Sequence, residues 1–321
     1  MMLSSATIVD IDFITMPNFL ISVVGPTAIG KTALSIKLAQ FFNSEIISAD
    51  SRQFYKEMKI GTAAPTEKEL AAVDHHFIYH ISIVESYTVG DFEKEAITKL
   101  NLLFETNNIS IMVGGSGLYV DAVVNGLDEF PKIKPQIREQ LNTRFEEEGL
   151  EPLKIELQKL DPSSFTRIET SNPHRVIRAL EVCLSSGKPY SSFLKSKKRK
   201  RNFEVLSIGL EADRALIYER INQRVDMMMN QGLLNEARNL YQKRHLNALN
   251  TVGYKELFKY FDGSWELDFA ISEIKKNTRR FAKRQLTWFK RNKETRWYDF
   301  DTDIEKIKMD LEQAILKKNK K

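Results

Sequence analysis

The hydrophobic pattern of the first 127 residues alternates between short apolar runs and amphipathic stretches. Residues 19–24, 45–49 and 109–113 form apolar runs with the length and composition of buried strands. Residues 33–42 and 91–104 have apolar positions at helical spacing. Repeated strand–helix units predict a parallel sheet with helices on both faces, and ligands of such sheets bind at the carboxyl ends of the strands.

The pattern changes near Leu127. From there the chain reads as consecutive helices without a convincing strand, until residues 203–210 predict a strand that returns to the sheet. The remainder is predicted to be mostly helical. We therefore expect an α/β core made of residues 1–127 and 203–321, with a helical insertion domain over residues 128–202.

A glycine-rich segment follows the first predicted strand and fits the phosphate-binding pattern GxxxxGK[ST]. It consists of Gly25, Pro26, Thr27, Ala28, Ile29, Gly30, Lys31 and Thr32. Its backbone amides and the N-terminus of the following helix suit a di- or triphosphate. Lys31 would reach the phosphates, and the Thr32 hydroxyl would bind Mg²⁺. The core is therefore predicted to be P-loop NTPase-like.

Asp50 follows the second predicted strand. A carboxylate at the end of a strand beside a phosphate crevice suits a general base, provided that a proton donor comes within hydrogen-bonding reach. A ligand of Mg²⁺ or water and a helix N-cap are the alternatives. The strand at 109–113 ends in Gly114-Gly-Ser-Gly117 and lacks the carboxylate with which ATP-hydrolysing motors hold Mg²⁺. This difference favours a small transferase.

Positive charge is concentrated in one part of the chain. Residues 185–300 contain 25 Lys and Arg but 13 Asp and Glu, whereas the net charge of the whole chain is +5. Such a distribution is typical of an enzyme that binds a polyanion. For any single cluster of Lys and Arg, a solvent-exposed helix face is the alternative interpretation. Residues 197–201 predict an exposed basic loop. In the basic helix 278–290, the seven-residue spacing of Phe281 and Trp288 predicts that both anchor the helix in the core.

Arg175 and Arg178 lie three residues apart in a predicted helix and share a face. They suit contact with nucleic acid and surface ion pairing equally well. His75, His76 and His80 lack further Cys or His residues at the spacing of zinc ligands, which argues against a zinc site. The single Cys183 excludes an internal disulfide, and no apolar run reaches membrane-spanning length. We expect a cytoplasmic monomer without membrane association, and translation from Met16 is one hypothesis for its start.

Seven segments, in their order along the chain, resemble the tRNA isopentenyltransferase (tRNA dimethylallyltransferase) family. They are residues 25–32, 50–55, 60–63, 114–119, 172–175, 252–254 and 280–285. The resemblance runs from about residue 19 to residue 300. It implies transfer of a dimethylallyl group from dimethylallyl diphosphate to the exocyclic amine of the adenosine that follows the anticodon in tRNA, with release of diphosphate.

The resemblance also implies roles for individual residues. Residues 25–32 would hold the diphosphate with Mg²⁺ at Thr32, Thr27 would meet the prenyl donor, and Asp50 would take the proton from the adenine amine. The helical insertion would close on the anticodon stem-loop. The positions that match tRNA contacts of the family are Asp50, Ser51, Arg52, Gln53, Ser116, Arg138, His174, Arg175, Val176, Ile177 and Arg178.

Two positions depart from the usual family pattern. Ala64 replaces a common lysine, and Ser116 replaces a threonine while keeping a hydroxyl. Because neither change affects Lys31, Thr32 or Asp50, we expect an active enzyme. Two other classes of function remain open at this point. One is a prenyltransferase for free adenine nucleotides, which needs no tRNA surface, and the other is a P-loop small-molecule kinase, which needs ATP.

Overall fold

The computed structural model describes residues 16–194 and 199–319. The chain divides into two compact units, of which one contains the chain up to Val124 and from Arg201 onward, and the other is Asn125–Lys200. This division lies two or three residues from the boundaries expected from the apolar pattern.

Two expectations fall partly or wholly outside this range. A start at Met16 concerns residues 1–15, which lie outside the described residues. Of the predicted basic loop at 197–201, residues 197 and 198 also lie outside them, whereas Arg199 and Lys200 are exposed.

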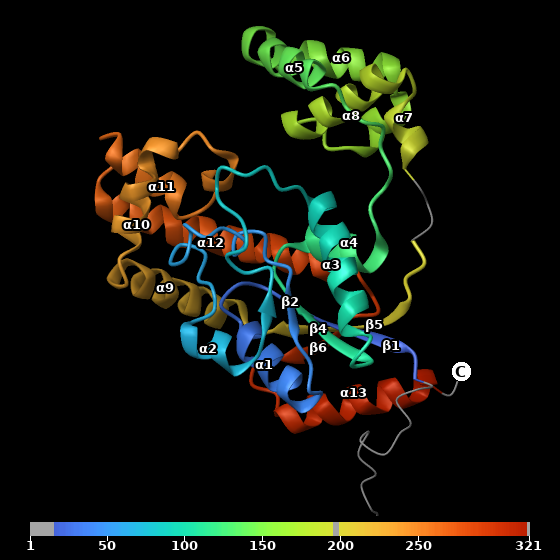
Figure 1. The fold of residues 1–321 in the computed structure, drawn as a ribbon. Coiled ribbons are helices and arrows are strands. Elements are labelled where there is room, and N and C mark those ends of the chain that lie inside the picture. The colour runs from blue at the N-terminus through green and yellow to red at the C-terminus, as the bar shows by residue number, and fades with distance from the viewer. Residues whose placement is uncertain (1–15, 195–198, 320–321) are drawn as a thin grey trace, which may run out of the picture. The chain divides into compact units, whose positions relative to one another are not determined.

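The first unit is built around a six-stranded sheet with the strand order β3-β2-β4-β1-β5-β6 (Figure 1). Every strand pair in it is parallel over the residues that the structure describes. The strands are β1 (Asn18–Val24), β2 (Ile46–Ser48), β3 (His75–His76), β4 (Ile109–Val113), β5 (Phe203–Glu211) and β6 (Arg296–Asp299). The predictions of β1, β2, β4 and β5 are confirmed, whereas β3 and β6 were not predicted.

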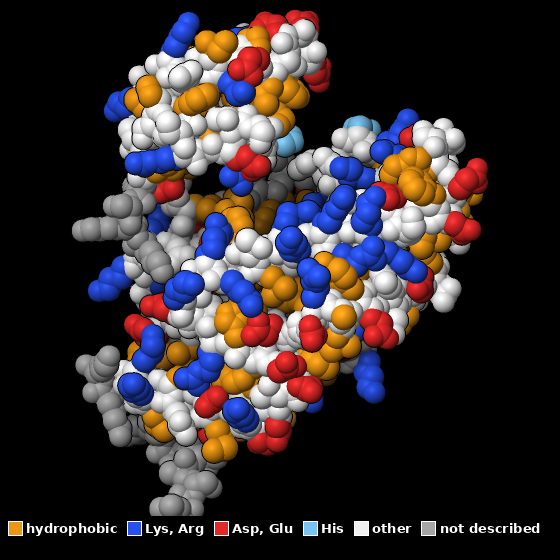
Figure 2. Space-filling model, turned by 180° about the vertical axis from the view of Figure 1, so that it is seen from behind, with side chains coloured by type: hydrophobic (Ala, Val, Ile, Leu, Met, Phe, Trp, Pro, Cys, Tyr) orange, Lys and Arg blue, Asp and Glu red, His pale blue; other side chains and the backbone are white. Residues whose placement is uncertain are grey.

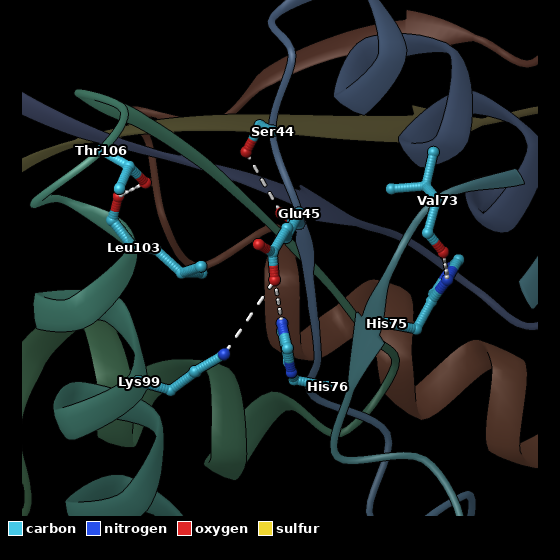
Figure 3. A network of polar contacts seen from close by, with 8 residues as sticks. All are labelled: Ser44, Glu45, Val73, His75, His76, Lys99, Leu103 and Thr106. Carbon is cyan, nitrogen blue, oxygen red and sulfur yellow. Dashed lines mark hydrogen bonds and ion pairs between the residues drawn. The ribbon is translucent and has the colours of Figure 1, made fainter.

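The two strands that the sequence did not reveal are edge strands. With two and four residues, they are too short for an apolar period to be detected. β3 is tied to β2 partly through side chains (Figure 3): the His76 ring contacts Glu45, and Lys99 approaches the same carboxylate at 4.0 Å. The His75 Nδ1 lies 2.7 Å from the carbonyl oxygen of Val73. The His76 side chain therefore fastens the edge strand to Glu45, the residue that precedes β2, whereas His75 makes a local contact within its own segment.

Helices cover both faces of the sheet because β1 buries side chains on both sides. Phe19, Ile21 and Val23 pack in one cluster with α1 (Lys31–Phe41) and α13 (Ile304–Asn319). Leu20 and Val24 pack in a second cluster with α3 (Val89–Leu103) and α4 (Gly117–Asn125), and Figure 1 shows these pairs of helices on opposite sides. Two-sided burial explains why β1 is a continuous apolar run.

A third cluster of buried side chains joins the helices of the C-terminal part. These are α9 (Arg214–Asn230), α10 (Leu233–Leu240), α11 (Tyr254–Phe261) and α12 (Leu267–Phe289). The short helix α2 (Glu67–Ala72) begins with a capping box formed by Thr66 and Glu69. No helix of the described residues is long and apolar enough to cross a membrane.

The second unit contains only helices among its described residues. They are α5 (Pro135–Glu148), α6 (Leu150–Leu160), α7 (Pro162–Arg167), α8 (Pro173–Ser186) and the 3-10 helix η2 (Tyr190–Phe193). Proline occupies the first turn of α5, α7 and α8, where a missing N–H costs no helical hydrogen bond. Leu141, Leu153, Leu157 and Leu180 form its core.

Candidate functional site

The 25–32 loop connects the central strand to a helix. β1 ends at Val24 and α1 begins at Lys31, so the loop lies at the carboxyl end of the sheet. Gly25 has φ 142°, and a Cβ there would lie 2.7 Å from the carbonyl oxygen of Leu210 on β5. Gly30 has φ 106° directly before the first turn of α1. Glycine is therefore favoured at both positions. The loop leads into the N-terminus of α1, whose backbone amides can bind an anion.

Lys31 is held inside this loop. Its Nζ donates a hydrogen bond to the carbonyl oxygen of Pro26 at 2.7 Å. Burial lowers the pKa of Lys31 from 10.5 to about 8, Asp50 opposes this shift, and Arg224 adds to it. A half-buried ammonium group without a full counter-charge favours binding of an anion.

Two cavities open beside the loop. The smaller, of about 50 Å³, is lined by Thr27, Lys31, Thr32 and Asp50, among others. The larger, of about 480 Å³, is also lined by Thr27 and Asp50, and it extends between α9 and α12 as far as Phe281. Because both cavities share these two residues, a phosphate group in the smaller one and an organic group in the larger one could belong to one molecule.

Asp50 begins a turn and not a helix, so the N-cap alternative is wrong. Its Oδ1 accepts a hydrogen bond from the N–H of Arg52 at 3.2 Å, and its carbonyl oxygen accepts one from the N–H of Gln53 at 3.0 Å. The carboxylate borders both cavities. It is therefore positioned to accept a proton from a molecule in either of them.

Arg224 is a residue of this site that the sequence did not reveal. It projects from α9, lines both cavities and donates a hydrogen bond from Nη2 to the carbonyl oxygen of Ala63 at 3.0 Å. Burial lowers the pKa of Arg224, and Asp50 opposes that shift. Within the sequence, this arginine looks like any other basic position of an amphipathic helix, and only the packing of α9 brings it to Lys31.

The 114–117 loop brings a second backbone segment to Asp50. A Cβ at Gly114 would lie 2.3 Å from the carbonyl oxygen of Ala49, so two backbone strands touch here. The Ser51 N–H donates a hydrogen bond to the Ser116 Oγ at 3.0 Å, and the two hydroxyl groups are also 3.0 Å apart. The segments around residues 25, 50 and 114 therefore lie together at the carboxyl ends of their strands, where the parallel sheet predicted from the sequence is expected to bind its ligands.

The comparisons with known proteins agree with this geometry. Residues 53–292 match the family model described as IPP transferase. A tRNA dimethylallyltransferase of Christiangramia forsetii is 60% identical over 292 residues, which cover 91% of this chain and 97% of the relative. The solved structure of a full-length tRNA isopentenylpyrophosphate transferase from Bacillus halodurans has a TM-score of 0.68 at 38% identity and covers 94% of this chain and 97% of its own.

A further solved structure, of a eukaryotic dimethylallyltransferase acting on tRNA, has a TM-score of 0.75 at 26% identity. It covers 89% of this chain, which spans 74% of that protein. The chain belongs to the IPP transferase family. The resemblance seen in the sequence is thereby confirmed, and it is supported by matches over most of the chain.

Within the second unit, one carboxylate binds two of the arginines that are predicted to contact tRNA. Arg138 and Arg178 both bind Glu181, whose side chain is 2% exposed, with Nη2 of Arg138 at 2.7 Å and Nη1 of Arg178 at 2.5 Å. The Arg178 guanidinium also lies 4.8 Å from the centre of the Phe130 ring. Each arginine side chain remains 40% exposed, so each keeps surface available to a partner.

The neighbouring positions on α8 divide into exposed and buried residues. His174 and Arg175 are exposed, and Arg175 lies 4.0 Å from Glu169. Val176 and Ile177 are 0% and 3% exposed and belong to the core of the helical unit. The prediction that these two residues contact tRNA is therefore corrected for their side chains, which fill the core; only their backbone groups could take part in such a contact.

Helix α12 carries the basic and aromatic residues of 278–290. Arg280, Lys283 and Arg284 are exposed, and Figure 2 shows Lys and Arg side chains gathered on this face of the first unit. Trp288 packs on the second core cluster, as predicted, and donates from Nε1 to Asp121 at 2.9 Å. Phe281 does not anchor the helix, because it belongs to none of the core clusters and lines the larger cavity.

Proposed function

We propose that this protein transfers a dimethylallyl group from dimethylallyl diphosphate to the exocyclic amine of the adenosine that follows the anticodon in tRNA, releasing diphosphate. The observation that carries the proposal is the pair of adjoining cavities, of which the smaller is lined by Lys31 and both are lined by Asp50 and Arg224. Relatives named tRNA dimethylallyltransferase and a solved relative acting on tRNA support the same donor and acceptor.

The diphosphate would occupy the smaller cavity. The amides of the 25–32 loop, Lys31 and Arg224 supply hydrogen-bond donors and positive charge where the leaving group gains charge. Mg²⁺ fits the same place, because the Thr32 hydroxyl and the phosphate oxygens of the donor are the kind of oxygen ligand that this ion prefers, which leaves the Asp50 carboxylate free to act as a base. When bound, the ion would neutralise part of the charge on diphosphate.

The amine and the prenyl carbon would meet in the larger cavity beside Thr27. A bond forms between the adenine nitrogen and the first carbon of the dimethylallyl group while the bond from that carbon to the diphosphate oxygen breaks. The nitrogen then loses one proton, and Asp50 would accept it. Positioned proton transfer of this kind contributes about 10²–10⁴-fold to a rate.

The acceptor base has to leave its stack to enter the cavity. Such flipping costs a few kcal/mol and is cheaper in a loop than in a duplex. Phosphate contacts by basic residues would offset this cost, and the exposed arginines and lysines of α12 are suited to them. Ser51, Arg52, Gln53, Ser116, His174 and Arg175 remain proposed tRNA contacts, as do Arg138 and Arg178. Monomeric state and cytoplasmic location are proposals of the same kind.

The direct test uses labelled dimethylallyl diphosphate. The expected result is label in tRNA, lost as salt concentration rises. Equal labelling of free AMP would favour the nucleotide prenyltransferase, and phosphate transfer from ATP without label in tRNA would favour the kinase. The relatives described above are all named for activity on tRNA and therefore support tRNA as the acceptor.

Asp50→Ala tests the proposed base. Turnover should fall by about 10²–10⁴-fold while tRNA affinity changes little, since the carboxylate acts on one proton. Asp268→Ala, which removes an exposed carboxylate from the first turn of α12, is the matched control. Near-normal turnover of Asp50→Ala would show that another group accepts the proton.

A further inference from the structure

Gln285 of α12 lies between two loops of the site that are far from it in the sequence. Its Oε1 accepts a hydrogen bond from the backbone N–H of Thr27 at 2.9 Å. Its Nε2 donates a hydrogen bond to the carbonyl oxygen of Gly115, also at 2.9 Å. The residue is 4% exposed. One buried amide group therefore fastens the 25–32 loop and the 114–117 loop to the same point of a helix.

The two loops serve different substrates in the proposed reaction. Thr27 borders both cavities beside the diphosphate-binding residues. Gly115 precedes Ser116, whose hydroxyl holds the backbone of Ser51 next to Asp50. A Cβ at Gly115 would lie 2.2 Å from Gln285 Nε2 and 3.6 Å from Asp50 Oδ2, so the amide and the carboxylate border the same small space. Gln285 thus links the donor side of the site to its acceptor side.

An amide is the side-chain group that satisfies both loops. Thr27 offers a donor and Gly115 an acceptor, so the side chain must present an acceptor and a donor at fixed separation. A carboxylate would face the Gly115 oxygen with a second acceptor, and an alkyl group would leave both backbone groups buried without these partners. The helix itself cannot shift easily, because Ala282 and Phe289 on either side of Gln285 are 1% and 5% exposed in the core.

We propose that Gln285 is a positioning residue that sets the separation of the donor and acceptor loops. This inference rests on the proposed function. Gln285 acts through Thr27 and Gly115, and its contribution is to hold the prenyl carbon and the adenine nitrogen at reacting distance. A misplacement of about 1 Å can cost about 10²-fold in rate without weakening the binding of either substrate.

The test compares Gln285→Leu and Gln285→Glu with Thr287→Ala, an exposed control on the same helix. Prenyl transfer to tRNA gives kcat and KM for both substrates, calorimetry with inorganic diphosphate and Mg²⁺ gives donor-side affinity, and thermal unfolding reports the folded fraction. For both Gln285 variants we expect kcat to fall about 10- to 100-fold, with KM and diphosphate affinity within about threefold of the wild type. The control should match the wild type.

A pH series separates positioning from a loss of folded protein. The protonated carboxyl group of Gln285→Glu regains a donor for the Gly115 oxygen, so its kcat relative to the wild type should rise as pH falls. Gln285→Leu should show no such rise.

The outcomes distinguish the inference from the function on which it rests. If both Gln285 variants turn over within twofold of the wild type, or if their losses reside entirely in KM or in the folded fraction, the positioning role is wrong. If the wild type itself transfers no prenyl group to tRNA, the proposed function fails and this inference fails with it.

Discussion

Replacing Lys31 by methionine should measure by how much the protonated lysine lowers the free energy of unfolding of this protein. Burial lowers the pKa of Lys31 from 10.5 to about 8. At 1.36 kcal/mol per pH unit, this shift corresponds to about 3 kcal/mol by which the protonated lysine disfavours the folded state. Because Lys31 is only half-buried by surface exposure, solvent screening makes this an upper figure.

The sign follows from the protons bound in each state. Unfolded chains keep the Lys31 proton up to about pH 10.5, whereas the folded protein releases it near pH 8. Between these values the unfolded state binds more protons, so the free energy of unfolding of the wild type rises with pH. Below pH 8 the protonated lysine destabilises the folded wild type by the full amount. Lys31→Met has no such group, so the stability advantage of the variant over the wild type should shrink by up to ~3 kcal/mol between pH 7 and 10.5.

Urea unfolding of both proteins across this pH range, in EDTA and without diphosphate, measures the difference. Subtracting the two proteins cancels the other groups that titrate, and the lost hydrogen bond from Lys31 to Pro26 adds only a constant. Lys37→Met, which changes an exposed lysine of the same helix, serves as the control. A difference between Lys31→Met and the wild type that stays constant with pH would refute the claim that the fold destabilises the charged amine.

Three further substitutions test the framework around the site. Gly114→Ala should destabilise the first unit by about 3 kcal/mol or more in chemical unfolding, because the new Cβ would lie 2.3 Å from a backbone oxygen; wild-type stability would contradict the close approach of the strands. Leu157→Ala removes a fully buried core residue of the helical unit and should cost about 2–5 kcal/mol, measured by unfolding followed by circular dichroism. Glu181→Gln should lower stability by about 1–3 kcal/mol in the same assay, since the carboxylate binds two guanidinium groups; an unchanged midpoint would show that these ion pairs contribute nothing.

Much of the site could be predicted because its chemistry is local in the chain. The 25–32 loop follows a buried strand and precedes a helix within a few residues, so its glycine pattern and its neighbours predict the same structure. Asp50 and the 114–117 loop could be added because parallel strands bring their carboxyl ends to one edge. The order of the matching segments then identified the family.

Other features depended on packing between distant segments. Whether Arg178 pairs with a buried carboxylate, and whether Val176 and Ile177 fill a core, depends on which face α8 turns toward α5 and α6. Phe281 was predicted to be a core residue, since helical spacing does not reveal that a cavity lies beside it. β3 escaped detection because two residues carry no period.

The sequence by itself determined the parallel α/β core, the phosphate-binding loop, the candidate base and the family. These follow from local backbone geometry and from the order of short motifs, both of which neighbouring residues encode. Only the tertiary structure decided that Arg224 meets Lys31 and that Gln285, which lies 258 positions after Thr27 in the chain, bridges Thr27 to Gly115. The physical reason is that such contacts form when helices pack onto the sheet, and the free energy of that packing is distributed over the whole core.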